Sequence, residues 1–176
     1  MSNAPEDLPT HDGTDEFAVI AWLCKAVQFE TSGEFELARH AYFTARDRVA
    51  LRKNRDSNDE IALARLNIIY GLFLARAEGL ESESFRVNRH ALAKKAFSNA
   101  AKILETEIEY AHANNMRAKC RQLEQDYKSA LQELLNLYQS HPSEYQPESA
   151  EARLIEARLE VIRAFENASP APWETA

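Results

Sequence analysis

The side chains best suited to chemistry in this chain are its histidines, its two cysteines and the carboxylates near them. Glu109 and His112 are three residues apart, which would place a carboxylate and an imidazole on one helical face as metal ligands. Two-metal carboxylate sites in helical bundles use two such pairs, and no second Glu-x-x-His occurs here. His40 and His90 lie beside apolar positions, where a structural role is favoured. We therefore predict no metal site and no cofactor.

Motifs for other kinds of catalysis are also missing from the sequence. It has no Gly-rich phosphate loop, no HExxH or CxxC pattern and no nucleophile elbow. Cys24 and Cys120 have no partners at metal-ligand spacing, so the sequence favours two buried free thiols in a reducing cytosol. We predict that the protein is not an enzyme.

Composition and charge narrow the class of partner. The 176 residues carry a formal net charge of −7, which argues against binding to the phosphate backbone of nucleic acid. The polar N-terminal stretch lacks the basic start and the apolar segment of a signal peptide. No apolar run reaches the roughly 18 residues that a membrane span needs. The expected protein is cytoplasmic, with no nucleic-acid partner and no membrane partner.

Helix-forming residues dominate the sequence, which contains only 4 glycines and 6 prolines. Apolar residues recur at three- and four-residue steps, which indicates an all-α fold of about six helices in antiparallel hairpins. The expected helices form one domain over 14–167, between a disordered tail at 1–13 and a flexible tail at 168–176. These helices cover about 15–31, 34–53, 58–78, 84–113, 115–140 and 148–167.

The stretch Trp22–Arg55 has the most regular pattern in the chain. Large and small residues alternate on both sides of Gly33, which can adopt the positive φ that ends one helix before another begins. The alternating residues are Trp22, Ala26, Phe29, Gly33, Phe35, Ala38, Tyr42 and Ala45. Their order and spacing resemble one tetratricopeptide (TPR) unit, and Ala93, Phe97 and Ala100 resemble part of a second. The resemblance implies a TPR-like right-handed superhelix or bundle with a concave binding groove.

The expected helix at 58–78 is apolar nearly all round, so it should lie at the centre of the fold. Asn67 interrupts this apolar run and would hydrogen-bond across the core or face a groove. Ser57 has capping-box spacing to Glu60 and is expected to open the helix. A basic cluster at the end of the preceding helix complements the helix dipole or forms a docking patch for an acidic peptide. The cluster consists of Arg46, Arg48, Arg52, Lys53 and Arg55.

These patterns predict a protein–protein interaction module: an adaptor, chaperone or regulatory subunit that binds a peptide or helix in a TPR-like groove. First-helix residues that point away from the packed positions should line this groove. The Lys and Asn pattern of chaperone-binding TPR domains is not recognisable in the sequence. The predicted partner-binding residues are Lys25, Gln28, Asn67 and Tyr70, with Arg39 and Arg46 at the edge.

Three alternatives remain open. The expected helix at 115–140 carries a coiled-coil-like seam, which would pack on the preceding helix or form a homodimer. Lys25–Ala45 also resembles part of a MIT domain, a three-helix module for short helical motifs that would cover about 15–80. The acidic balance suits an acidic inhibitor of a basic partner. The seam residues are Met116, Cys120, Leu123, Tyr127, Ala130, Leu134 and Leu137.

Overall fold

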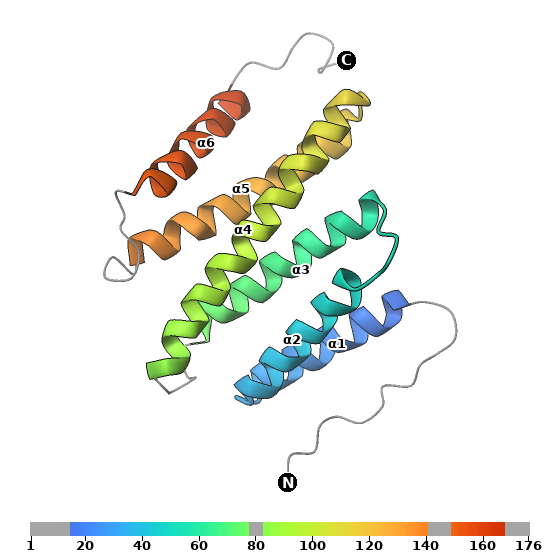
Figure 1. The fold of residues 1–176 in the computed structure, drawn as a ribbon, viewed down its shortest axis with the longest axis vertical. Helices are drawn as coiled ribbons and strands as arrows, with labels where there is room; N and C mark the ends of the chain where they lie inside the picture. The colour runs from blue at the N-terminus through green and yellow to red at the C-terminus, as the bar shows by residue number, and fades with distance from the viewer. Residues whose placement is uncertain (1–14, 78–82, 141–148, 168–176) are drawn as a thin grey trace. The chain divides into compact units, whose positions relative to one another are not determined.

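The computed structural model describes residues 15–77, 83–140 and 149–167. These ranges contain six helices and no strand, which confirms the predicted all-α class (Figure 1). The predicted tails at 1–13 and 168–176 lie outside the described residues. The helices are α1 (Asp15–Thr31), α2 (Phe35–Ala50), α3 (Ser57–Arg76), α4 (Glu83–Ala113), α5 (Arg117–Ser140) and α6 (Ala150–Asn167).

The chain divides into two compact units, and the division falls within α4, between Ile103 and Leu104. In the first unit α1 packs against α2 and α2 against α3, and in the second unit α5 packs against α6. Each unit buries large apolar side chains, such as Phe73 in the first and Leu123 in the second. The organisation as one TPR-like domain stays a prediction.

Two of the connections between helices contain a residue in the left-handed conformation. Gly33 at the α1–α2 turn has φ 76°, and Asn115 at the α4–α5 turn has φ 55°. At both turns this residue donates its N–H to the carbonyl three residues back, and the next N–H reaches the carbonyl five residues back. This is the Schellman motif, which satisfies the last carbonyls of a helix. The predicted helix break at Gly33 is therefore confirmed.

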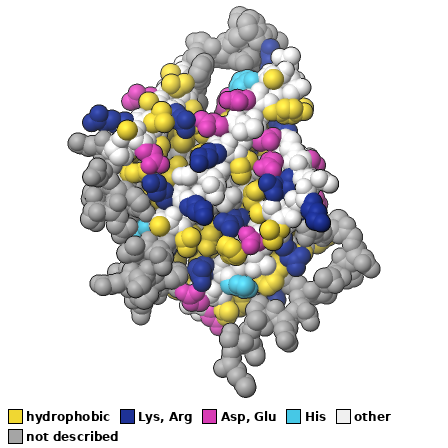
Figure 2. Space-filling model, viewed as in Figure 1, with side chains coloured by type: hydrophobic (Ala, Val, Ile, Leu, Met, Phe, Trp, Pro, Cys, Tyr) yellow, Lys and Arg dark blue, Asp and Glu magenta, His cyan; other side chains and the backbone are white. Residues whose placement is uncertain are grey.

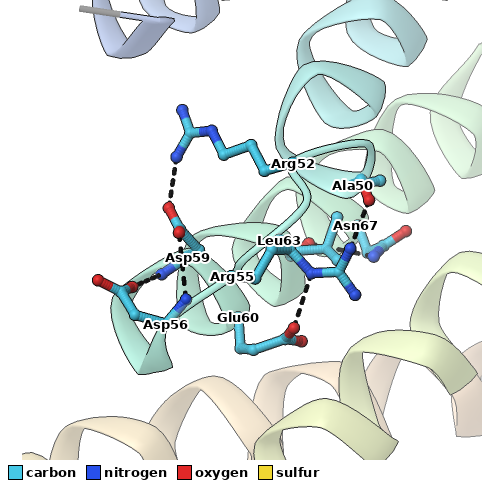
Figure 3. Close-up of polar contacts among 8 residues, drawn as sticks. All are labelled: Ala50, Arg52, Arg55, Asp56, Asp59, Glu60, Leu63 and Asn67. Carbon is cyan, nitrogen blue, oxygen red and sulfur yellow. Dashed lines mark hydrogen bonds and ion pairs between the residues drawn. The ribbon is translucent and has the colours of Figure 1, made fainter.

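The structure corrects the predicted boundaries between α2 and α3 (Figure 3). α2 ends at Ala50 rather than near Lys53. The N-cap of α3 is Asp56, not Ser57: the Asp56 carboxylate accepts the Asp59 N–H at 2.8 Å, and the Asp59 carboxylate accepts the Asp56 N–H at 3.2 Å. Both carboxylates also lie at the positive end of the helix dipole, an advantage that a serine hydroxyl lacks.

Part of the basic cluster is paired with acidic side chains at the start of α3. Arg52 forms an ion pair with Asp59, and Arg55 Nε donates to Glu60 Oε1 at 2.7 Å. Arg55 also donates to the Ala50 carbonyl, which is one of the terminal carbonyls of α2 that lack a partner within the helix. A backbone N–H at the N-cap and then Arg52 hold the pKa of the Asp59 carboxyl below its ordinary value. These two arginines therefore stabilise the α2–α3 connection.

Gly71 on α3 allows the ring of Phe97 on α4 to lie close to the α3 backbone. A Cβ atom at position 71 would be 2.7 Å from Phe97 Cε1 and 2.9 Å from Phe97 Cζ. Phe97 is fully buried, and so are Ala93 and Ala100 on either side of it. The small–aromatic–small pattern of α4 therefore packs in the core of the first unit.

One carboxylate links the three helices α1, α2 and α3. Glu30 on α1 accepts the Tyr42 hydroxyl of α2 at 2.8 Å. The same carboxylate accepts two hydrogen bonds from Arg76 at the end of α3, one from Nε at 2.5 Å and one from Nη2 at 2.8 Å. The hydrogen bond from Arg76 outweighs burial and holds the pKa of Glu30 below its ordinary value. In a bidentate arginine–carboxylate pair, the two parallel hydrogen bonds fix the relative orientation of the side chains in addition to the attraction between their charges.

In the second unit a glutamate, a tyrosine and an arginine again link three helices. Glu105 on α4 accepts the Tyr127 hydroxyl of α5 at 3.1 Å and pairs with Arg158 of α6 at 3.1 Å. The apolar seam predicted for α5 is buried in the folded chain, except for its first residue, Met116, which is exposed. The buried seam residues are Cys120, Leu123, Tyr127, Ala130, Leu134 and Leu137.

The buried hydroxyl of Tyr42 predicts a loss of stability in alkali. Burial, followed by the hydrogen bond to Glu30, raises the pKa of Tyr42 from 10.0 to about 12. Because the folded-state pKa is the higher one, the contribution of this group is complete below about pH 10 and is lost as the pH rises toward about 12. Urea unfolding is followed by Trp22 fluorescence at about pH 8 and about pH 11, in a Trp173→Phe background that leaves one tryptophan. The alkaline loss should be smaller when Tyr42→Phe is added to this background than without it. Equal losses in the two proteins would contradict this, and Tyr110→Phe, at an exposed tyrosine, is the control.

Candidate functional site

A groove of about 550 Å³ lies among residues of α2, α3 and α4 in the first unit. Its volume is in the range of sites that hold ligands. α2 contributes Phe43 and Arg46, and α3 contributes Leu63, Asn67 and Tyr70. Apolar, aromatic, basic and amide side chains line the groove, and no carboxylate is found among the described residues that line it.

The structure brings together three of the predicted partner-binding residues, because Arg46, Asn67 and Tyr70 all line this groove. Arg39 is not part of the lining, but its charge acts on the Tyr70 hydroxyl. Burial raises the pKa of Tyr70, and the charges of Arg39 and Arg46 only partly offset that effect. The hydroxyl is therefore neutral near pH 7, and it interacts with Arg39 as well as lying beside the groove.

The other two predicted residues are on α1, which does not line the groove. Lys25 lies over the ring of Trp22, with Nζ 5.5 Å from the ring centroid, and Gln28 is exposed. The prediction that Cys24 is buried is wrong, because α1 packs through the face of Trp22 and Ala26 and leaves Cys24 exposed. The exposed residues Phe17, Ile20 and Val27 share the helical face of this cysteine.

Two aromatic rings hold Arg46 at the groove. The guanidinium carbon of Arg46 is 4.6 Å from the centroid of the Phe43 ring and 5.5 Å from that of the Tyr70 ring. The two rings contact each other edge to face, with 6.1 Å between centroids. Asp47 accepts a hydrogen bond from Arg46 at 3.3 Å. The cation–π contacts restrict the guanidinium group and keep a positive charge beside an apolar surface.

Asn67 lies in an environment that leaves one of its polar atoms unsatisfied. The residue is 3% exposed, and its Nδ2 donates to the Leu63 carbonyl at 3.1 Å. Its Oδ1 is buried and has no hydrogen-bond partner, and in Figure 3 this oxygen points away from the bond to Leu63. A buried acceptor without a donor costs about 1–3 kcal/mol. The predicted position of Asn67 at a groove therefore coincides with an atom that a bound partner could satisfy.

α4 contributes lining residues that the sequence reasoning missed. Leu92, Lys95, Asn99, Lys102 and Ile103 all line the groove. They recur at three- and four-residue steps, so they form a stripe along one side of α4. The two lysines of this stripe lie next to the buried stripe of Ala93, Phe97 and Ala100. This pattern could have identified the lining residues of α4, but only once α4 was known to pack on α3.

The second unit has a smaller pocket, of about 290 Å³, at the α4–α5 turn. His112 Nε2 is 3.4 Å from Glu124 Oε1 there, whereas Glu109 is exposed. Within 15–77, 83–140 and 149–167, no group of three His, Cys, Asp or Glu side chains is placed to hold a metal ion. Cys120 also lines this pocket and is buried as predicted, and burial raises the pKa of its thiol. A thiol with a raised pKa is a weak nucleophile at neutral pH.

In the part of the chain that the structure describes, no helix has both the length and the apolar character needed to cross a lipid bilayer. In comparisons with known proteins, no family model, no curated protein and no solved structure matches this chain.

Proposed function

We propose that the protein is a protein–protein interaction module whose first unit binds a peptide or helical segment of another protein in the groove. The observation that carries this proposal is the buried, unpartnered Oδ1 of Asn67 on the groove lining. A bound segment would cover apolar side chains such as Phe43 and Leu63 and would supply the missing donor. This function suits an adaptor, a chaperone or a regulatory subunit in the cytoplasm.

The length of the groove favours a polymer segment over a compact metabolite. The α4 side of the lining extends from Leu92 to Ile103, which corresponds to about 16 Å along the helix axis. A helix of about three turns, or an extended segment of about five residues, has this length. Both are recognised units of peptide binding by helical proteins.

The alternative of a homodimer through the α5 seam has less support. The seam residues Leu123, Ala130 and Leu134 are already buried in the folded chain. A dimer through this seam would require the chain to expose them first, at a substantial loss of buried apolar area. The groove of the first unit, in contrast, is accessible in the folded chain.

Asn67→Leu is expected to raise the free energy of unfolding by about 1–2 kcal/mol and to abolish partner binding. Leucine has a similar size and a higher helix propensity, and it removes the buried oxygen that has no donor. Chemical denaturation measures the first effect and partner capture the second. Asn99→Leu, at a half-buried lining position, is the control for stability. A destabilised Asn67→Leu protein would show that the amide satisfies the fold and not a partner.

A pull-down from the lysate of the native host tests the proposal. The baits are the full chain, Phe43→Ala in the groove and Phe17→Ala on the exposed face of α1, all shown to be folded by circular dichroism. We expect a partner that the full chain and Phe17→Ala capture and that Phe43→Ala loses. Retention by Phe43→Ala would place the interface outside the groove. Recovery of only the protein itself would favour the homodimer.

A further inference from the structure

We propose that the partner segment inserts a tryptophan into the groove, where the indole N–H donates a hydrogen bond to Asn67 Oδ1. The inference rests on the proposed function, because it names the side chain by which the same groove holds its partner. Three properties of the lining support it: the hydrogen bonding and burial of Asn67, the lack of a carboxylate among the described lining residues, and the aromatic rings next to Asn67.

Asn67 lacks a donor for its oxygen. Its Nδ2 already donates to the Leu63 carbonyl at 3.1 Å, whereas its Oδ1 has no hydrogen-bond partner. An indole nitrogen only donates, so it satisfies this oxygen without bringing an acceptor that needs a donor of its own. Hydroxyl, amide and neutral imidazole side chains also donate, but each of them carries an acceptor into the same lining. Among the neutral side chains, tryptophan therefore matches Asn67 best.

The burial of this oxygen favours an inserted side chain over a backbone contact. Asn67 is 3% exposed although it lines the groove, and Oδ1 is itself buried. A segment that lies across the rim keeps its backbone N–H groups at the surface, too far from a buried atom to donate to it. A side chain that projects from the segment can enter between the lining residues, as the anchor residues of protein interfaces do.

The charge of the lining disfavours lysine and arginine as the donor. Arg46 and Lys95 line the groove, and the described lining residues include no carboxylate. Figure 2 likewise shows Lys and Arg side chains interspersed with hydrophobic ones on the face viewed. A partner ammonium or guanidinium group would therefore lose its hydration in the groove without gaining an opposite charge. The donor is uncharged.

The rings beside Asn67 suit a flat apolar side chain. Tyr70 follows Asn67 by three residues on α3, so the two side chains are neighbours on one helical face. Phe43 contacts the Tyr70 ring edge to face and is itself 38% exposed, and Arg46 lies over both rings. An indole ring can pack against Phe43, and tryptophan is the strongest of the aromatic residues in cation–π contacts.

The test uses a phage-displayed library of random linear peptides of about 12 residues, long enough for three helical turns, selected on the full chain. Recovered peptides are synthesised, and their binding is measured by fluorescence anisotropy. Each is also made with 3-benzothienylalanine in place of tryptophan, which puts sulfur at the position of the indole N–H and keeps the shape of the ring. The protein variants are Asn67→Leu, which removes the acceptor, and Asn99→Leu, the same change elsewhere in the lining.

We expect the recovered peptides to share one tryptophan. Loss of the indole N–H should raise their dissociation constants at least about tenfold on the unsubstituted chain, and Asn99→Leu should keep this ratio. On Asn67→Leu the order should reverse, so that the benzothienyl peptide binds more tightly than the tryptophan peptide. A purely structural effect of Asn67→Leu would weaken both peptides alike and would leave their order unchanged.

Different failures separate this inference from the proposed function. Recovered peptides that lack tryptophan, but that lose binding to Phe43→Ala, would overturn the tryptophan and keep the groove as a peptide site. An equal effect of the benzothienyl change on the unsubstituted chain and on Asn67→Leu would overturn the hydrogen bond to Asn67. Failure to recover any peptide whose binding depends on Phe43 or Asn67 would overturn the proposed function itself.

Discussion

Phe97→Ala is expected to lower the free energy of unfolding of the first unit by about 3–5 kcal/mol, the usual loss when a buried phenylalanine is truncated. The ring is fully buried and lies against α3 at Gly71. Its removal leaves a cavity beside a position that has no side chain, so little is available nearby to fill the space. Urea unfolding measured by Trp22 fluorescence, in a Trp173→Phe background that leaves one tryptophan, reports the loss.

Two further substitutions make this prediction specific. Phe17→Ala removes the same ring from a position that is 71% exposed, so we expect a change within about 0.5 kcal/mol. Gly71→Ala should destabilise the unsubstituted chain, because the new methyl group would overlap the Phe97 ring. In the Phe97→Ala background the same methyl group should be neutral or stabilising. Strictly additive effects of the two changes would contradict the contact between them.

Leu159→Ala is expected to lower the free energy of unfolding of the second unit by about 2–5 kcal/mol. Leu159 is 1% exposed, and it shares the buried stripe of α6 with Ala152 and Ile155. α6 packs against α5, so loss of this side chain weakens the attachment of α6 to its neighbour. Urea unfolding followed by far-ultraviolet circular dichroism measures the change.

Leu154→Ala is the matched control for Leu159→Ala. It makes the same chemical change on the same helix, at a position that is 52% exposed. We expect a change within about 0.5 kcal/mol, because little apolar surface returns to water. Equal losses at the two positions would show that the buried face of α6 is not the one that the structure assigns.

Helix positions can be predicted from the sequence where their signals are local. Gly33 marks the α1–α2 turn because few other residues adopt a positive φ without strain. The end of α2 is less readable, since the contact of Arg55 with the Ala50 carbonyl depends on the path of the whole connection. Asp56 and Ser57 are both good N-caps, and only the reciprocal bonds with the residue at N3 decide between them.

The groove can be predicted only in part, because it depends on contacts between distant segments. Asn67 is conspicuous as a polar residue in an apolar helix, which is a local signal. The lysines of α4 are not, because their position follows from the packing of Phe97 on Gly71, a pairing that no short pattern encodes. The exposure of Cys24 has a similar cause, since the sequence does not state that α1 is covered on one side only.

The different exposure of the two thiols allows the opening of the second unit to be measured in the native protein. Cys24 is exposed, so its rate of reaction with an alkylating reagent serves as the reference rate for an accessible cysteine. Cys120 is 4% exposed, so it should react only during moments when the second unit opens. The ratio of the two rates, followed by mass spectrometry in native buffer, therefore measures how often this unit opens without the use of denaturant.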